Sequence, residues 1–294
     1  MVLCNRSISE NTQTDDRLTL TRRRVLLAGG GVAGLAGGGA LYVTSALGGD
    51  FGDETAPETH PTITTRGRGS PDSSNASPEL EGSWDDESEE LFVFVHGFDT
   101  DDATARDQAY TTQVGLESLR PAPVAAYSWD SDVDWEPAKE LADANAAALA
   151  DWLVEWADED GRPVHLIGYS LGARLCVETL EVLTDASQGE VVTSVSLLGG
   201  AVPDDSVELE GRYGETIETL EAPVSNFHSG NDRVLSWVYR LSDRTRAVGH
   251  HGIADPEAAP VGYTDVDVTD QVEDHFSYFQ PEEGCLPQLV EELP

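Results

Sequence analysis

The most constraining feature of the sequence is the stretch VHLIGYSLGAR, residues 164–174, in which a serine stands between two glycines. The apolar run before Ser170 is typical of a buried strand, and the segment LGARLCVETLEVL after it is typical of a helix. Where a strand passes into a helix through one tight turn, the residues two before and two after the turn residue must be small. Gly168 and Gly172 meet that need. We therefore predict that Ser170 is a nucleophile held in a strained turn, with a purely structural turn serine as the alternative.

Short β-favouring runs alternate with segments of helical composition through the rest of the chain. The expected strands lie in LFVFVHGF, APVAAYSW, RPVHLIGYS, VVTSVSLLGG, APVSNFHSG and GYTDVDVTD, and several are apolar on consecutive residues. The expected helices cover residues 101–119, 135–157, 171–183 and 233–241, with a weaker candidate at 207–220. Connections of this length join parallel strands by crossovers rather than hairpins. The pattern predicts one α/β domain over residues 88–294, built on a doubly wound, mostly parallel sheet of about six strands.

A serine hydroxyl needs a base to become a nucleophile, and the base needs an acid to orient it. Asp232 follows an apolar run in VSNFHSGNDRVL, and His275 follows the last expected strand in QVEDHFSYF. We predict Asp232 as the acid and His275 as the base, because Ser, Asp, His is the chain order that this architecture requires. A helix N-cap is the alternative role for Asp232. His250 and His251, in GHHGI, are rival candidates for the base.

Acyl transfer through a serine also needs two backbone N–H groups that bind the oxyanion. Leu171, directly after the serine at the start of a helix, is expected to supply one of them. The segment FVHGF, after the first strand of the 88–294 domain, should bring Gly97 and Phe98 beside the serine, and we predict the Phe98 amide as the second donor. We assign His96 and Gly97 to the binding part of the site. We expect His96 to be structural rather than the base, because it precedes the serine in the chain.

The segments HGF, GYSLGAR, GNDRV and DHF, in this order, resemble the α/β-hydrolase superfamily over residues 91–279. Within it, HLIGYSLGAR together with VSLLGGAVP resembles a poorly characterised group related to the domain-of-unknown-function 726 proteins. The resemblance implies a compact α/β-hydrolase fold with Ser170 as nucleophile, Asp232 as acid and His275 as base. It also implies an oxyanion hole formed by the Phe98 and Leu171 amides. The first strands of larger superfamily members are missing from the expected pattern, and no lid insertion follows the sixth strand.

These residues predict a serine esterase or lipase-like hydrolase that cleaves a carboxylic ester, on a small-molecule or lipid-like substrate, through an acyl-serine intermediate. An acyltransferase or thioesterase with the same triad and a non-catalytic surface protein of the same fold are the alternatives. No metal-ligand spacing occurs in the sequence, and we expect neither a metal nor a cofactor. Cys176 and Cys285 are expected to be two separate buried thiols rather than a disulfide.

The beginning of the chain has the layout of a targeting segment. Arg22, Arg23 and Arg24 precede an uncharged run that extends to Gly49, as in a twin-arginine export signal. The run is also long enough, at roughly 20 apolar residues, to span a bilayer, so residues 25–47 are a candidate membrane tether. We therefore predict that residues 1–49 are an export signal or membrane anchor, and that the protein is extracellular or anchored to the outer face of the cell membrane.

Residues 50–87 are rich in Pro, Ser, Thr, Gly and acidic residues and poor in apolar ones. Such a composition cannot repay the entropy cost of ordering the chain, and it predicts a disordered tether. Asn75 begins the tripeptide Asn-Ala-Ser, which is a glycosylation sequon in an exported protein.

The charge balance limits the partners of the protein. The chain has 55 Asp and Glu against 17 Lys and Arg, a formal net charge of -38. A surface of this sign repels nucleic acid and anionic lipid headgroups, so we expect no nucleic-acid partner. The acidic residues run through the expected helices as well, as in DWLVEWADEDG. This spread favours adaptation to high salt, where cations screen the repulsion, over an acidic tail.

Overall fold

The computed structural model of the chain describes residues 53–68, 77–84, 87–239 and 245–294. The predicted export signal or anchor, residues 1–49, and the Asn75 sequon lie outside these ranges. No helix within these ranges is long and apolar enough to cross a membrane.

The described ranges form one eight-stranded sheet in the order β2-β1-β4-β3-β5-β6-β7-β8. The strands are β1 (Thr62–Thr64), β2 (Glu79–Glu81), β3 (Leu91–Val95), β4 (Val124–Ser128), β5 (Val164–Tyr169), β6 (Ser194–Leu198), β7 (Val224–His228) and β8 (Tyr263–Asp267). All neighbouring strands pair in parallel except β1 and β2, which are antiparallel. The predicted doubly wound sheet of α/β-hydrolase type is confirmed, with eight strands instead of about six.

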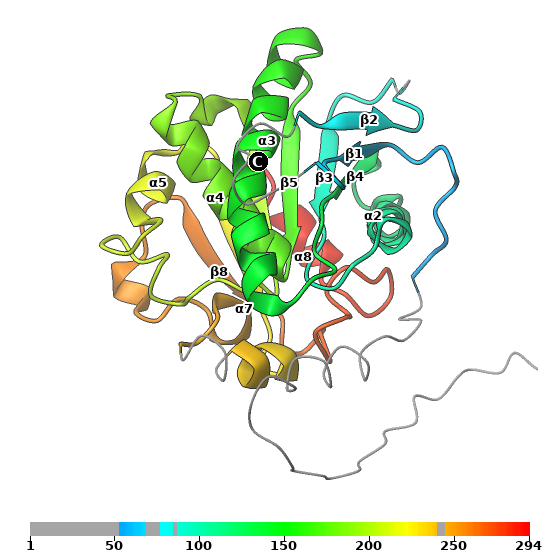
Figure 1. Ribbon diagram of the computed structural model, residues 1–294. Coiled ribbons are helices and arrows are strands. Elements are labelled where there is room, and N and C mark those ends of the chain that lie inside the picture. The colour runs from blue at the N-terminus through cyan, green and yellow to red at the C-terminus, as the bar shows by residue number, and fades with distance from the viewer. Residues whose placement is uncertain (1–52, 69–76, 85–86, 240–244) are drawn as a thin grey trace, which may run out of the picture. The chain divides into compact units, whose positions relative to one another are not determined.

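Helices cover both faces of this sheet. They are α2 (Asp102–Leu116), α3 (Trp135–Glu159), α4 (Leu171–Asp185), α5 (Gly214–Thr219), α7 (Val248–His251) and α8 (Leu286–Glu291), with a π-helical turn η2 (Leu235–Tyr239) and short 3-10 turns η1 (Gly189–Val191) and η3 (Pro256–Ala258). In Figure 1, α3 and α4 lie in front of the sheet and α8 lies behind it. The buried apolar side chains form one large cluster under α3 and α4, a second under α2 and α8, and a small third one that includes Ala201 and Leu235.

The local sequence explains why these elements form. Every residue of β3 and β5 is buried, as expected for central strands covered on both faces. The helix α3 carries small and apolar residues at helical spacing on its buried side, and α2 begins at Asp101, whose carboxylate accepts a hydrogen bond from the Thr104 N–H at 2.8 Å. Cys176 and Cys285 are both buried and neither forms a disulfide, so the prediction of two separate thiols is confirmed.

The two additional strands correct the prediction for the described part of residues 50–87, namely 53–68 and 77–84. The sequence predicted a disordered tether there, with no strand before LFVFVHGF. In the structure, β1 pairs with β4 and β2 pairs with β1. Ile63 is fully buried, and the Ala126 N–H donates to the Pro61 carbonyl oxygen at 3.0 Å. A strand of three residues with one large apolar side chain gives almost no signal in the sequence. It forms because it satisfies the backbone groups along β4, which would otherwise be an open sheet edge.

Candidate active site

Ser170 occupies the turn between β5 and α4 in a strained conformation. Its φ of 54° and ψ of -117° lie in a region that non-glycine residues rarely adopt. A side-chain carbon at Gly168 would lie 2.7 Å from Ala173 Cα, and one at Gly172 would overlap the carbonyl oxygens of Val95 and His96. Both glycines are therefore required by the close approach of strand, turn and helix.

Three predicted side chains meet at the carboxyl end of the sheet. Ser170 follows β5, Asp232 follows β7 and His275 follows β8. The His275 Nδ1 lies 2.6 Å from Asp232 Oδ2, and its Nε2 lies 3.0 Å from Ser170 Oγ. A carboxylate can only accept, so Nδ1 carries the proton of the neutral imidazole and Nε2 accepts from the serine hydroxyl. In this geometry His275 Nε2 can take the proton of the Ser170 hydroxyl as the serine oxygen attacks a substrate.

The surroundings of Asp232 and His275 hold both side chains in place. The other carboxylate oxygen of Asp232 accepts from the Leu235 N–H at 2.9 Å, and the residue is fully buried. The Tyr278 hydroxyl lies 3.3 Å from Asp232 Oδ2 and 2.9 Å from the Gly249 carbonyl oxygen. The Tyr169 hydroxyl donates to the His275 carbonyl oxygen at 2.9 Å. Sequence reasoning missed both tyrosines, because a tyrosine near a motif carries no signal of its own.

The rival histidines have other contacts. His250 and His251 lie on the short helix α7, and their rings pack at a centroid distance of 4.0 Å. The His250 Nδ1 donates to the Ser229 carbonyl oxygen at 3.1 Å. Among the three histidines considered for the base, it is His275 that lies within hydrogen-bond distance of Ser170.

The loop after β3 passes directly beside the serine. A side-chain carbon at Gly97 would lie 2.8 Å from Ser170 Cβ and 3.3 Å from its Oγ. Within the described residues, neither the Phe98 N–H nor the Leu171 N–H donates a hydrogen bond to another protein group. The two predicted oxyanion donors are thus unpaired amides on segments that flank Ser170.

His96 lies inside the protein behind this loop. It is fully buried, and its ring stacks on Trp129 with an angle of 7° between the planes. Burial, together with the cation of Arg66, lowers the pKa of His96 to about 3. A general base must reach the reacting hydroxyl and the substrate, which a fully buried ring cannot do. These contacts therefore favour the structural role predicted for His96.

An aromatic cluster borders the loop on its other side. The Phe98 and Trp135 rings pack edge to face at 5.2 Å, and Trp135 packs on Tyr239 at 6.3 Å. Ala201 and Leu235 belong to the same buried apolar group. Phe98 and Trp135 are only partly buried, and Phe98 directly follows Gly97, which lies beside Ser170.

No group of His, Cys, Asp and Glu residues in the described ranges could hold a metal ion. A cavity of about 450 Å³ lies at the amino ends of the strands, among residues such as His60, Trp84 and Tyr110, and none of the Ser170, Asp232 and His275 side chains lines it.

The sequence matches the family described as "Protein of unknown function (DUF726)" over residues 104–289. The Transmembrane and coiled-coil domain-containing protein STS1 of Oryza sativa subsp. japonica is 32% identical over 188 residues, which are 60% of this chain and 27% of that protein. An uncharacterized membrane protein of Schizosaccharomyces pombe is 31% identical over 167 residues, which are 53% of this chain and 28% of that protein. The chain thus matches little more than a quarter of the length of these relatives, both of which are named as membrane proteins.

Similar solved structures include esterases and a lipase. The esterase domain of a Rhodothermus marinus protein has a TM-score of 0.44 at 17% identity and covers 74% of this chain and 92% of its own. A Pyrobaculum calidifontis esterase has a TM-score of 0.40 at 18% identity and covers 69% of this chain and 75% of its own. Aspergillus fumigatus lipase B has a TM-score of 0.41 at 14% identity and covers 68% of this chain and 50% of its own.

Proposed function

This chain belongs to the DUF726 family of proteins of unknown function, and we propose that it is a serine hydrolase that cleaves a carboxylic ester through an acyl-serine intermediate. The proposal rests on one observation above the others. Ser170, His275 and Asp232 form a continuous hydrogen-bonded chain, with separations of 3.0 Å and 2.6 Å, at the carboxyl end of the sheet. A serine in a strained turn, next to a neutral imidazole held by a buried carboxylate, has the geometry that acyl transfer requires.

The reaction follows from these contacts. His275 Nε2 takes the hydroxyl proton as Ser170 Oγ bonds to the ester carbonyl carbon, and Asp232 stabilises the resulting imidazolium. The Phe98 and Leu171 amides bind the negative oxygen of the tetrahedral intermediate. The intermediate collapses, the bond to the alcohol oxygen breaks, and His275 returns its proton to that alcohol. Water, deprotonated by the same nitrogen, then hydrolyses the acyl-serine and restores the hydroxyl.

The surface near the serine favours an uncharged, apolar part of the substrate. Phe98 follows the glycine that lies beside Ser170, Trp135 packs against the Phe98 ring, and both residues are only partly buried. With a formal net charge of -38, the protein also disfavours anionic esters through long-range repulsion. We propose a neutral small-molecule or lipid-like ester as the substrate class.

The location and the working conditions belong to the same proposal. The three arginines and the uncharged run within residues 1–49 support export by the twin-arginine route, with residues 25–47 as a tether if the segment is retained. The large excess of carboxylates supports activity in concentrated salt, where screening removes most of their repulsion. The protein would then act as an extracellular or surface-anchored halophilic esterase.

Hydrolysis of neutral aryl esters of increasing acyl length, measured in high salt, tests this function. We expect turnover by the wild-type protein and loss of about 10³-fold or more in kcat for Ser170→Ala, because the triad acts as a unit. Adding a primary alcohol or thiol acceptor shows whether the acyl group passes to water or to the acceptor. Transfer to the acceptor in preference to water would assign an acyltransferase, and no turnover of any ester or thioester would support a non-catalytic role.

A further inference from the structure

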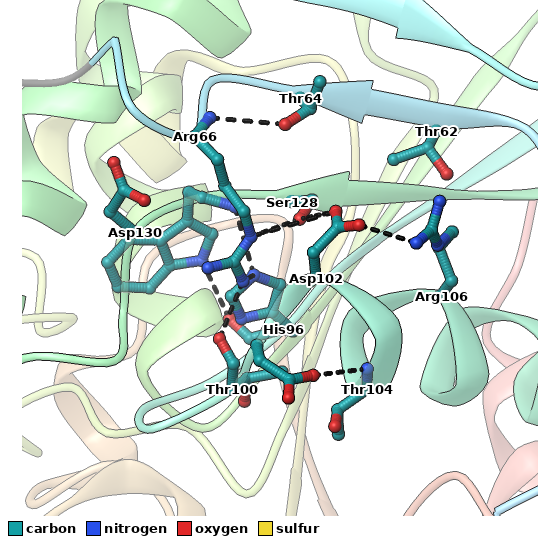
Figure 2. Close-up of polar contacts among 12 residues, drawn as sticks. Thr62, Thr64, Arg66, His96, Thr100, Asp102, Thr104, Arg106, Ser128 and Asp130 are labelled. Atoms are coloured by element: carbon teal, nitrogen blue, oxygen red, sulfur yellow. Dashed lines mark hydrogen bonds and ion pairs between the residues drawn. The ribbon is translucent and has the colours of Figure 1, made fainter.

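A largely buried arginine joins the first strand to the loop beside the serine. Arg66 lies just after β1, and its side chain is 16% exposed. Its Nε–H donates to Ser128 Oγ at 2.6 Å, and its Nη2 lies 2.7 Å from the Thr100 carbonyl oxygen and 3.2 Å from His96 Nε2. Figure 2 shows the guanidinium reaching from β1 to the end of β4 and to the loop after β3. One side chain therefore ties three separate segments together.

Two carboxylates lie within ion-pair distance of the guanidinium. Asp102 Oδ1 accepts from Ser128 Oγ at 2.9 Å and lies 3.9 Å from Arg66 Nε. Figure 2 shows the Asp102 carboxylate beside Ser128 and the guanidinium. Asp132 Oδ1 lies 3.6 Å from Nη1. These carboxylates offset part of the cost of burying the guanidinium charge.

These bonds fix the proton of the His96 ring. The Trp129 N–H donates to His96 Nε2 at 3.1 Å, in addition to the bond from Arg66. A ring nitrogen that accepts hydrogen bonds carries no proton, so the proton is on Nδ1. From there it is donated to the Gly97 carbonyl oxygen at 2.9 Å. Arg66 and the Trp129 N–H together favour the tautomer that holds the Gly97 carbonyl, and Arg66 also fixes the position of the ring from the side of β1.

The direction of the Gly97 carbonyl determines that of the next amide. The peptide bond between Gly97 and Phe98 is planar and trans, so its C=O and N–H point in opposite directions. With the carbonyl tied to His96, the Phe98 N–H points away from that ring, on a loop that touches Ser170. We propose that Arg66 is a positioning residue, which acts through His96 to aim the Phe98 N–H at the oxyanion of the transition state. This inference rests on the proposed function, and it gives a role to a strand that precedes the residues matched by the family, 104–289.

The test compares Arg66→Met and Arg66→Lys with the wild-type protein. Methionine fills the space without donors, and lysine keeps the charge but has no planar fork to reach all three acceptors together. Since loss of an oxyanion donor costs about 10²–10³-fold in kcat, we expect both variants to lose about 10- to 100-fold in kcat with KM changed less than about three-fold. The affinity for a boronic acid, which forms a tetrahedral adduct on the serine, should fall in proportion to kcat. The same substitutions at Arg68, which is 46% exposed and pairs with Glu79, are the matched controls and should leave both quantities unchanged.

A purely structural role for Arg66 would lower the melting temperature and leave kcat of the folded protein and boronate affinity unchanged, which would overturn the inference. Wild-type kcat for Arg66→Lys would overturn it as well, and this variant decides the matter alone if Arg66→Met does not fold. His96→Asn keeps an N–H near the position of Nδ1, so it should retain more kcat than His96→Leu, and equal losses would count against the relay. A wild-type protein that neither hydrolyses esters nor binds the boronic acid would instead refute the proposed function, and this inference with it.

Discussion

Replacing Asp232 with Asn isolates the contribution of the carboxylate to catalysis. In the wild-type protein, Asp232 Oδ1 accepts from the Leu235 N–H at 2.9 Å, and the amide oxygen of Asn can accept this bond in its place. The Tyr278 hydroxyl keeps the Gly249 carbonyl oxygen as its partner. At the 2.6 Å contact, however, an amide N–H would face His275 Nδ1. The imidazole proton would then move to Nε2, which could no longer accept from Ser170. We expect kcat to fall about 10⁴-fold, or about 5 kcal/mol in transition-state stabilisation, because the wrong tautomer is favoured.

Initial rates of hydrolysis of a neutral aryl ester in high salt measure this loss of kcat, and thermal unfolding measures the accompanying change in stability. Stability should change by only about 1 kcal/mol, since most hydrogen bonds of the site are kept. Asp274→Asn is the matched control, because Asp274 adjoins His275 but its carboxylate accepts from Ser277 Oγ at 2.7 Å and from the Phe276 N–H at 3.0 Å, which an amide oxygen can also do. Turnover by Asp232→Asn within about ten-fold of the wild type would refute the orienting role of the carboxylate.

Four further predictions follow from the sequence and structure. His275→Ala should lose turnover as fully as a variant without the serine, whereas His251→Ala should retain it, and abolished turnover in folded His251→Ala with intact turnover in His275→Ala would reverse the assignment of the base. Burial raises the pKa of Glu178 from 4.5 to about 7, so the folded protein holds the proton more tightly than the unfolded chain. The melting temperature should therefore fall as the pH rises from 4.5 to about 7, and Glu178→Gln should flatten that fall. The melting temperature should also fall steeply on dilution from about 1 M to about 0.1 M salt, as the Debye length grows from about 3 Å to about 10 Å, and a flat salt profile would contradict adaptation to high salt. Replacing Arg22 and Arg23 with Lys should trap the protein in the cytoplasm of its host, as shown by fractionation, and unchanged export would argue against a twin-arginine signal.

The parts of the fold that the sequence predicted correctly are those with strong local signals. The central strands β3 and β5 are runs of mostly apolar residues that are buried throughout, as expected where both faces of a strand are covered. The turn at Ser170 was predictable because its geometry demands Gly168 and Gly172 at fixed positions. The order of acid and base along the chain then pointed to Asp232 and His275.

The parts that the sequence did not predict depend on contacts between distant residues. β1 has a single large apolar side chain, Ile63, and is stabilised by pairing with β4, about 60 residues further along the chain. Arg66 lies in a Pro- and Thr-rich segment that contains no motif. The positioning role that we propose for it depends on the contacts that β1 brings to the loop after β3. Tyr278 was missed for the same reason, because nothing near it in the sequence indicates that its hydroxyl reaches Asp232.

The central claim, that Ser170 is an activated nucleophile, is tested most directly by labelling the full chain with a fluorophosphonate in high salt and identifying the modified peptide. The probe bonds covalently to a serine oxygen only where a base removes its proton, so it reports nucleophilicity without knowledge of the substrate. We predict a single label on Ser170, absent in Ser170→Ala and formed far more slowly in His275→Ala. A label on any other serine, or no label on a protein shown to be folded, would contradict it.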